Sequence, residues 1–329
     1  MDTNANLLVS QRCALIISVF MCVGLCQAQQ KGQYVPGQFG LNAGVVPAAG
    51  LTYANLALNY SASSLNDANG NHRPNVVGTY GFWVDENIFY FVPTKKILGA
   101  TFAPYISLNG ANGTLVADIS GTNLGAAGGG SGFADLFVQP VNLGWHLKRA
   151  DIVAGYAFVA PTGRFVAGAS DNVGSGYWGN NLNFGTTVYV TKNRGTTLNL
   201  FSDWETHGQK TGTTLTPGKA FTIEWGIGQV LPLKKDFSRL LQLGLIGYDQ
   251  WQVTASSGTI VILPASSVPF YSGHAVGFQS NFILPAKNLN FFFKYLDEYR
   301  AISRPEGRTI AFGGSWTLRI PKPVAAPKP

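Results

Sequence analysis

The stretch Thr309-Ile-Ala-Phe-Gly-Gly-Ser-Trp-Thr-Leu-Arg-Ile320 alternates between apolar side chains and polar or small ones. On an extended strand, one face would carry Ile310, Phe312, Trp316, Leu318 and Ile320. The other face would carry Thr309, Ala311, Gly313, Ser315, Thr317 and Arg319. Successive side chains of a strand point to opposite faces, and a strand between lipid and a polar lumen has this pattern. The stretch therefore predicts an all-β fold whose strands cross a membrane as a barrel.

The same alternation recurs in residues 182–190, 196–207 and 221–229. Near the start of the chain, Leu56, Leu58 and Tyr60 alternate with Asn55 and Asn59. We expect the three apolar side chains to face lipid. Segments rich in Gly, Pro, Asn and Ser separate the alternating runs and predict turns. With about 10 residues for each crossing, the chain has room for a single antiparallel barrel of about 12–14 strands.

The alternation changes phase at Pro140: Leu136 and Val138 share the apolar face before it, and Val141 continues that face after it. Proline lacks the N–H that a sheet needs, and a β-bulge adds one residue and reverses the facing. We predict one bulged strand here, with two short strands as the alternative. The Gly-rich stretch 121–132 predicts a mobile loop, either extracellular or folded into the lumen.

The N-terminus has the parts of a secretory signal peptide, namely Arg12, an apolar run and a small residue, Ala28, at the expected cleavage site. All three cysteines lie in this run, so the exported chain would have no disulfide. We predict four parts: a signal peptide (1–28), an N-terminal periplasmic segment (29–49), the transmembrane β-barrel (50–320) and a Pro-rich periplasmic tail (321–329).

The composition also points to a membrane barrel. Only 12% of the residues are charged, 12% are aromatic, and the formal net charge is +7. After the signal peptide no run of 18 apolar residues occurs, which excludes a helical membrane protein. The Lys and Arg residues are scattered, which disfavours nucleic acid as a partner and suits contact with anionic lipid headgroups. We therefore expect the bacterial outer membrane as location and its lipid as a partner.

Catalytic signatures are missing from the sequence. It has no Gly-x-Ser-x-Gly elbow, no His-Glu-x-x-His and no phosphate-binding loop, and its four histidines lie far apart. We therefore expect no enzyme, no cofactor and no metal site. An outer-membrane enzyme is a distant alternative, and a Ser/His/Asp cluster brought together inside the lumen would favour it.

Polar residues on the inward faces are the candidate lumen and ligand-lining residues. Inward charges in a barrel commonly pair across the lumen or set the field of a pore. The candidates are Asp135, His146, Arg164, Asp203, Glu205, Glu224, Gln250, Lys294 and Arg319. Tryptophans suit the belts at the two membrane interfaces, and the candidates for these belts are Trp145, Trp178, Trp225, Trp251 and Trp316.

Several motifs, taken together in their order and spacing, resemble one family. The longest is Gly132-Phe-Ala-Asp-Leu-Phe-Val-Gln-Pro-Val-Asn-Leu-Gly-Trp-His146, followed by Gly155-Tyr-Ala-Phe-Val-Ala-Pro-Thr-Gly-Arg-Phe165. Gly176-Tyr-Trp-Gly-Asn-Asn-Leu-Asn-Phe-Gly185 and Gly247-Tyr-Asp-Gln-Trp-Gln-Val253 come next. This sequence is similar to the family named for the MetA pathway of phenol degradation, over roughly residues 50–320. One departure is the Pro-rich tail after Ile320, because many outer-membrane barrels end in an aromatic residue.

The resemblance implies an outer-membrane barrel linked to the uptake of aromatic or other hydrophobic compounds. We therefore expect a porin-like channel for passive uptake of small hydrophobic, aromatic solutes. A structural or adhesive envelope barrel with a blocked lumen is the alternative. A continuous, aromatic-lined path through the lumen would favour the channel, and a plugged lumen without such a path would favour the structural barrel.

Overall fold

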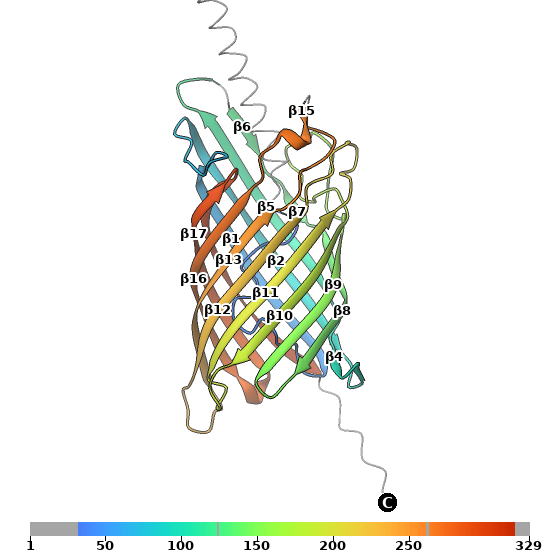
Figure 1. The fold of residues 1–329 in the computed structure, drawn as a ribbon, viewed down its shortest axis with the longest axis vertical. Helices are drawn as coiled ribbons and strands as arrows, with labels where there is room; N and C mark the ends of the chain where they lie inside the picture. The colour runs from blue at the N-terminus through green and yellow to red at the C-terminus, as the bar shows by residue number, and fades with distance from the viewer. Residues whose placement is uncertain (1–31, 124, 261–262, 320–329) are drawn as a thin grey trace, which may run out of the picture.

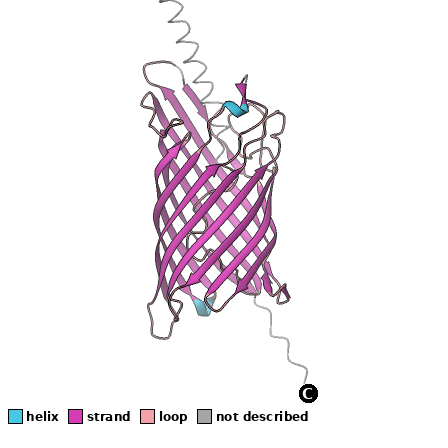
Figure 2. Ribbon diagram, viewed as in Figure 1, coloured by secondary structure: helices cyan, strands magenta, loops and turns pink. Residues whose placement is uncertain are grey.

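The computed structural model describes residues 32–123, 125–260 and 263–319 as a closed antiparallel β-barrel of 12 long strands (Figures 1 and 2). Strand β1 pairs with both β2 and β18, and β5 pairs with β8, so that the sheet closes on itself. The long strands are β1 (Gly50–Leu65), β2 (Val76–Val92), β5 (Tyr105–Ile119), β8 (Leu136–His146), β9 (Ala150–Ala160), β10 (Gly179–Tyr189), β11 (Thr196–His207), β12 (Ala220–Pro232), β13 (Leu240–Gln252), β16 (Ser272–Leu284), β17 (Leu289–Ile302) and β18 (Pro305–Arg319). The predicted barrel and its strand number are confirmed.

Short elements complete the described chain. They are β3 (Lys96–Ile97), β4 (Ala100–Phe102), β6 (Gly125–Gly128), β7 (Ser131–Phe133), β14 (Thr259–Ile260), β15 (Leu263–Pro264) and the 3₁₀ turns Ala265–Ser267 and Pro285–Lys287. In the described ranges no helix is long and apolar enough to cross a membrane. The predicted signal peptide and the Pro-rich tail lie outside the described residues.

The two ends of the barrel differ in the length of their connections. Short turns, such as residues 147–149 and 285–288, lie at the end where β1 begins and β18 ends. Longer connections, such as residues 161–178 and 253–271, lie at the other end. Outer-membrane barrels have short periplasmic turns and long extracellular loops. We therefore assign the end where β1 begins and β18 ends, which is the lower end in Figure 1, to the periplasm.

Strand β12 shows the predicted facing clearly. Phe221, Ile223 and Ile227 lie on the outer face, whereas Thr222 and Glu224 are buried inside. Strands β10, β11 and β18 likewise expose apolar side chains and bury polar or small ones. Exposed apolar side chains around the wall match a surface that meets hydrocarbon.

Strand β1 has the opposite facing, and the prediction for it needs correction. Leu56, Leu58 and Tyr60 are buried inside the barrel, and Asn55 and Asn59 lie on the outer face. The alternation fixes which residues share a face, but either face can be apolar if the lumen beside it is apolar. Here the lumen is apolar, because Leu56 and Leu58 pack in one cluster with aromatic residues of neighbouring strands, including Tyr80 and Phe82.

The predicted bulge at Pro140 is confirmed, because β8 is one strand whose pairing with β9 shifts register between Val138 and Val141. The Gly-rich stretch differs from the expected loop. Within it, β6 pairs with β5, and β7 continues the same pairing. Glycine allows this approach: a Cβ on Gly129, whose φ is +151°, would lie 2.3 Å from the Gly113 carbonyl oxygen.

Candidate functional site

The described part of the N-terminal segment, residues 32–49, lies inside the barrel and is here called the lumen segment; it is the blue thread within the barrel in Figure 1. Gln33 contacts Glu205 near the extracellular end of β11, and Gly44 contacts Thr187 near the periplasmic end of β10. The expected periplasmic location of residues 29–49 therefore needs correction for the described residues. The physical reason is that inward-facing side chains supply the hydrogen-bond partners that the segment's backbone requires.

Glu224 is the main anchor of the lumen segment. Its carboxylate accepts hydrogen bonds from the Tyr34 hydroxyl and from backbone N–H groups of the next turn: those of Gly37 (2.8 Å), Gln38 (3.2 Å), Phe39 (2.8 Å) and Gly40 (3.1 Å). Gly37 and Gly40 have φ values of +95° and +55°, which let these N–H groups converge on one carboxylate. The interaction is charge-assisted and excludes water, since Glu224 is 1% exposed.

Lys294 holds the opposite side of the same turn. Its ammonium group donates to the carbonyl oxygens of Gly37 (3.0 Å) and Gln38. The turn is thus bound between a carboxylate that takes its N–H groups and an ammonium that takes its carbonyl groups. Lys294 and Glu224 come from β17 and β12, so the segment links two strands that are not adjacent in the sheet.

Glu205 and Gln250 bind the extracellular end of the segment. The Glu205 carboxylate accepts from the N–H groups of Gln33 (2.8 Å) and Tyr34 (2.7 Å), and Gln250 donates to the Tyr34 carbonyl oxygen (3.3 Å). Asp203 instead accepts from the Asn181 side chain (2.7 Å) and lines the cavity described below. Of Asp203, Glu205 and Glu224, the two glutamates therefore hold the lumen segment.

The remaining candidates lie in different places. Asp135 is buried where β7 meets β8 and accepts from the N–H groups of Gly163 (3.0 Å) and Ser175 (2.7 Å), so it holds an extracellular loop. His146 lies at the periplasmic rim beside Asp151 (3.0 Å). Arg164 is exposed in a loop. The side chain of Arg319 lies outside the described part of the structure.

The predicted belt tryptophans lie on or near the outer face. Trp251 belongs to a row of rings across the extracellular ends of β11, β12, β13, β16 and β17, with centroid separations of 5.5–6.3 Å. The row consists of Trp204, Phe221, Trp251, His274 and Tyr299. Trp178 lies at the same end, Trp145 and Trp316 lie near the periplasmic end, and Trp225 donates to Asp249 (3.3 Å).

A cavity of about 430 Å³ lies between the lumen segment and the wall formed by β1, β2, β5 and β8. Nine aromatic side chains contribute to its lining: Tyr34, Phe39, Tyr80, Phe82, Tyr90, Tyr105, Phe137, Phe201 and Phe292. The Phe39 and Phe201 rings stack at 4.0 Å, and Tyr105 contacts both Tyr90 (4.6 Å) and Phe137 (5.7 Å). Volume and lining are those of a site for a small apolar ligand.

The two halves of the lumen differ in chemistry. The half formed by β10 to β16 presents Thr187, Asn199, Glu224 and Gln279, each of which binds the backbone of the lumen segment. The other half presents the aromatic and aliphatic side chains of the cavity. The lumen segment therefore packs on the polar half and leaves open space against the apolar half.

Polar side chains also line the cavity, and several of them are hydrogen-bonded. Glu86 accepts from the Gln38 side chain (3.0 Å), and Asn183 exchanges hydrogen bonds with Gln139 (3.1 and 3.2 Å). In the described parts of the chain, His, Cys, Asp and Glu do not form any group of three or more that could hold a metal ion. The site can therefore hold an apolar molecule and orient it by a few polar contacts.

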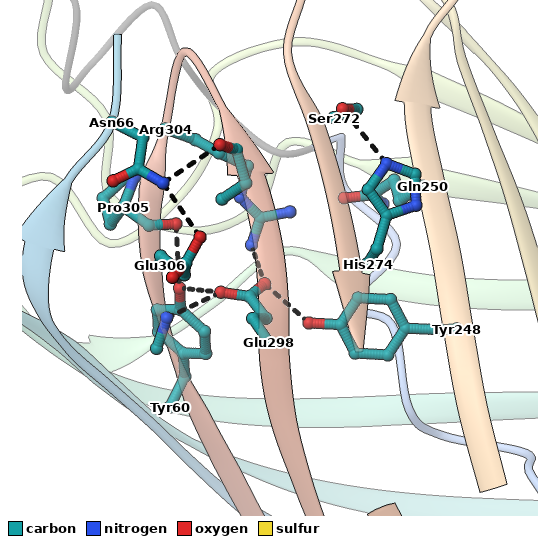
Figure 3. Close-up of polar contacts among 12 residues, drawn as sticks. Tyr60, Asn66, Tyr248, Gln250, Ser272, His274, Glu298, Arg304, Pro305 and Glu306 are labelled. Atoms are coloured by element: carbon teal, nitrogen blue, oxygen red, sulfur yellow. Dashed lines mark hydrogen bonds and ion pairs between the residues drawn. The ribbon is translucent and has the colours of Figure 1, made fainter. Parts of the chain in front are cut away.

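A buried ionic cluster at the extracellular end was missed by the sequence reasoning (Figure 3). The Glu298 carboxylate pairs with Arg304 and accepts from the hydroxyl groups of Tyr60 (2.7 Å) and Tyr248 (2.7 Å) and from the Gly307 N–H (2.8 Å). Tyr60 and Tyr248 come from β1 and β13, which are not adjacent. The cluster therefore cross-links strands through the interior of the barrel.

The aromatic lining was missed as well, although one signal for it exists. Strand β2 carries Trp83, Phe89 and Phe91 on its outer face and Tyr80, Phe82 and Tyr90 on its inner face. A strand that is aromatic on both faces separates lipid from an apolar lumen. That pattern could have placed the cavity beside β2.

Comparison with known proteins supports the fold. The chain resembles the crystal structure of the COG4313 outer membrane channel from Pseudomonas putida F1, with a TM-score of 0.65 and 14% identity, over 86% of this chain and 99% of that one. It also resembles the beta domain of the Bordetella autotransporter BrkA, with a TM-score of 0.51 and 9% identity, over 82% of this chain and 100% of that one. At these identities the likeness concerns the fold alone.

No curated protein sequence matches the chain. The closed barrel with apolar side chains on its outer face places the protein in the bacterial outer membrane. The sequence pattern of one family matches residues 62–312, which is most of the chain. The chain therefore belongs to the family described as putative MetA-pathway of phenol degradation.

Proposed function

We propose that the barrel is a channel that lets small hydrophobic, aromatic compounds pass the outer membrane passively. The observation that carries this proposal is the cavity of about 430 Å³ and its aromatic lining. Aromatic rings offer large apolar surfaces and favourable ring–ring contacts to an aromatic guest.

The comparisons agree with this proposal. The family takes its name from phenol degradation, and one structural neighbour is described as an outer membrane channel. The proposed passage involves no reaction of the solute. Among the described lumen-facing residues, no hydrogen bond joins a serine to a histidine, which is the arrangement that an esterase site in the lumen would need.

A barrel with a blocked lumen is the second candidate, and the lumen segment favours it. This segment runs from Glu205 to Thr187 through the lumen and is bound along its length. If the barrel is a channel, the lumen segment forms one wall of the path and moves when a solute passes. If the barrel is structural, the lumen segment is a permanent plug.

Binding of the fluorescent apolar probe N-phenyl-1-naphthylamine to the purified protein, followed by displacement with toluene or phenol, tests the cavity. Ala111→Trp would fill the cavity from β5 and should abolish probe binding. Leu108→Trp is the matched control, because Leu108 lies on the same strand, faces outward and is 47% exposed. Equal probe binding by both variants would contradict the cavity as the binding site.

Single-channel recording in planar bilayers separates the channel from the plug. A channel should show openings whose current falls when toluene occupies the path, and Ala111→Trp should reduce the openings. A folded barrel with no conductance, whether or not toluene is present, would favour the structural barrel.

A further inference from the structure

Three side chains at the extracellular end form a connected Ser–His–Asp chain. His274 and Ser272 are two residues apart on β16, and Asp249 lies opposite His274 on β13. The His274 Nδ1 atom is 2.7 Å from Asp249 Oδ1, and the His274 Nε2 atom is 3.3 Å from Ser272 Oγ. Figure 3 shows the contact between Ser272 and His274.

These residues belong to the outer face of the wall, away from the proposed channel. Ser272 and His274 pair in register with Trp251 and Asp249, and the His274 ring lies 5.5 Å from Trp251 and 6.1 Å from Tyr299. Tyr299 is 63% exposed, so this face points outward, whereas Ser272 is only 7% exposed, so an ester reaches its hydroxyl only when the side chains that cover it move aside. Gln250, which follows Asp249 on β13, and Gly273, which lies between Ser272 and His274 on β16, face the lumen.

The hydrogen bonds set the roles of the groups. In the tautomer of His274 that carries its proton on Nδ1, Asp249 accepts that proton's hydrogen bond, and Nε2 is an acceptor for the Ser272 hydroxyl. The Trp225 indole N–H also donates to Asp249 (3.3 Å) and fixes the carboxylate. Nucleophile, base and orienting acid thus stand in the order that a hydrolytic triad requires.

The ring row described above places the triad at the depth of a membrane interface. Trp and Tyr side chains gather where headgroups meet hydrocarbon, and this is also where the ester bonds of membrane lipids lie. Arg300 lies opposite His274 on β17 and is exposed. Its guanidinium group adds a positive charge to this region of the wall, which suits the phosphate of a lipid.

We propose that Ser272, His274 and Asp249 hydrolyse carboxylic ester bonds of lipids in the outer leaflet. The Ser272 oxygen attacks the ester carbonyl while its proton passes to His274 Nε2. The C–O bond to the alcohol then breaks, and the departing oxygen takes the proton from His274. Water next attacks the acyl-serine, gives its proton to His274 and releases the fatty acid as the serine hydroxyl is restored. Only water and the ester are consumed.

The test uses the full exported protein, refolded in detergent micelles that contain phosphatidylethanolamine. Heat-dependent migration in gels verifies that each variant is folded. The wild type should release fatty acid and react with a fluorophosphonate probe, and mass spectrometry should find the probe on Ser272. Ser272→Ala and His274→Gln should lower the rate by roughly 10⁶-fold, as removal of the serine or the histidine of a triad does elsewhere.

Ser280→Ala is the matched control, since Ser280 lies farther along β16 on the same outer face. It should keep the full rate of fatty acid release. Binding of the naphthylamine probe in the lumen should be the same in Ser272→Ala as in the wild type, which separates this activity from the channel. No release by the folded wild type, or an equal rate in folded Ser272→Ala, would overturn the proposal. Probe labelling of the wild type at a residue other than Ser272 would overturn it as well.

Discussion

At the residue scale, the lumen is organised by charges that bind backbone rather than one another. Glu224, Glu205 and Lys294 were expected to pair across the lumen or to set the field of a pore. In the structure, Glu224 and Glu205 accept N–H groups of the lumen segment and Lys294 donates to its carbonyl groups. A buried charge without such partners would cost several kcal/mol. The lumen segment and the inward charges therefore stabilise each other.

Glu224→Gln should loosen the lumen segment. The amide keeps the shape but loses the charge, and it brings an N–H₂ group toward the N–H groups of Gly37 to Gly40. The free energy that holds the lumen segment should fall by about 1.5–3 kcal/mol, which is typical of a hydrogen bond to a charged group. The population of molecules with a released segment would then rise by roughly 10- to 100-fold. Conductance in planar bilayers should rise accordingly.

Asp85→Asn is the control for this change. Asp85 also carries a carboxylate, but it lies on the outer face and accepts from Asn55 (2.7 Å) and Asn87 (3.0 Å). The conductance of Asp85→Asn should equal that of the wild type. If the conductance of Glu224→Gln also equals that of the wild type, Glu224 does not hold a movable segment.

At the scale of elements, each strand has its faces defined by local alternation, and each loop packs by contacts that the alternation does not describe. Strands β12 and β18 carry lipid-facing apolar residues, whereas β1 turns its apolar set inward. The extracellular loops pack on one another: Thr211 N–H donates to the Gly176 carbonyl oxygen (2.8 Å), and Thr216 and Ser257 exchange backbone hydrogen bonds. The strands form the wall, and the loops cover its extracellular end.

Phe312→Arg and Ser315→Arg test the two faces of β18. Phe312 is 48% exposed on the outer face, and Ser315 faces inward. Arginine on the lipid face costs about 2–4 kcal/mol near the bilayer midplane, because the charge must enter hydrocarbon. Refolding into lipid vesicles should therefore show this loss for Phe312→Arg and a much smaller one for Ser315→Arg. Equal losses would reject the assigned facing.

Lys210 makes the packing of the extracellular loops depend on pH. It is 5% exposed and lies over the rings of Phe165 (5.4 Å) and Tyr177 (5.8 Å), and burial lowers its pKa to about 8. The unfolded pKa is near 10.5, so below pH 8 both states are charged and the folded state bears the full cost of burying that charge. Between about pH 8 and about pH 10.5 the folded state has released this proton, while the unfolded state still binds it. The free energy that the unfolded state gains by binding the proton shrinks as the pH rises, so the cost of burying Lys210 falls.

The measurement for this effect is the thermal unfolding midpoint of the wild type and of Lys210→Met between pH 7 and pH 10. The stability of the wild type relative to Lys210→Met should increase over this range. Lys192→Met, which removes an exposed lysine from a periplasmic turn, should show no such trend. A constant difference between Lys210→Met and the wild type would contradict the lowered pKa.

At the scale of the whole molecule, the barrel is asymmetric in two directions. Along its axis, short turns lie at the periplasmic end and long loops at the extracellular end. Across its axis, a polar half binds the lumen segment and an apolar half lines the cavity. The Glu298–Arg304 cluster ties β1, β13 and β17 together near the extracellular end. The axial asymmetry fixes the orientation in the membrane.

Cysteine labelling of intact cells tests this orientation. Asn69→Cys lies in the exposed connection between β1 and β2, and Leu98→Cys, at an 83% exposed position, lies in the connection after β2. A membrane-impermeant maleimide should label Asn69→Cys on intact cells and Leu98→Cys only after the outer membrane is permeabilised. The reverse pattern would invert the assignment of the two ends.

The sequence by itself determined the barrel, its approximate strand number, the bulge at Pro140 and the facing of β12 and β18. These features follow from period-two alternation and turn chemistry, which are local properties of the chain. Only the tertiary structure decided that β1 faces its apolar set inward, that the N-terminal segment enters the lumen and that an aromatic cavity remains beside it. Glu224 and Gly37 are 187 positions apart, and no local pattern encodes their contact. The closure of the sheet brings such residues together, because it fixes which strands face one another across the lumen.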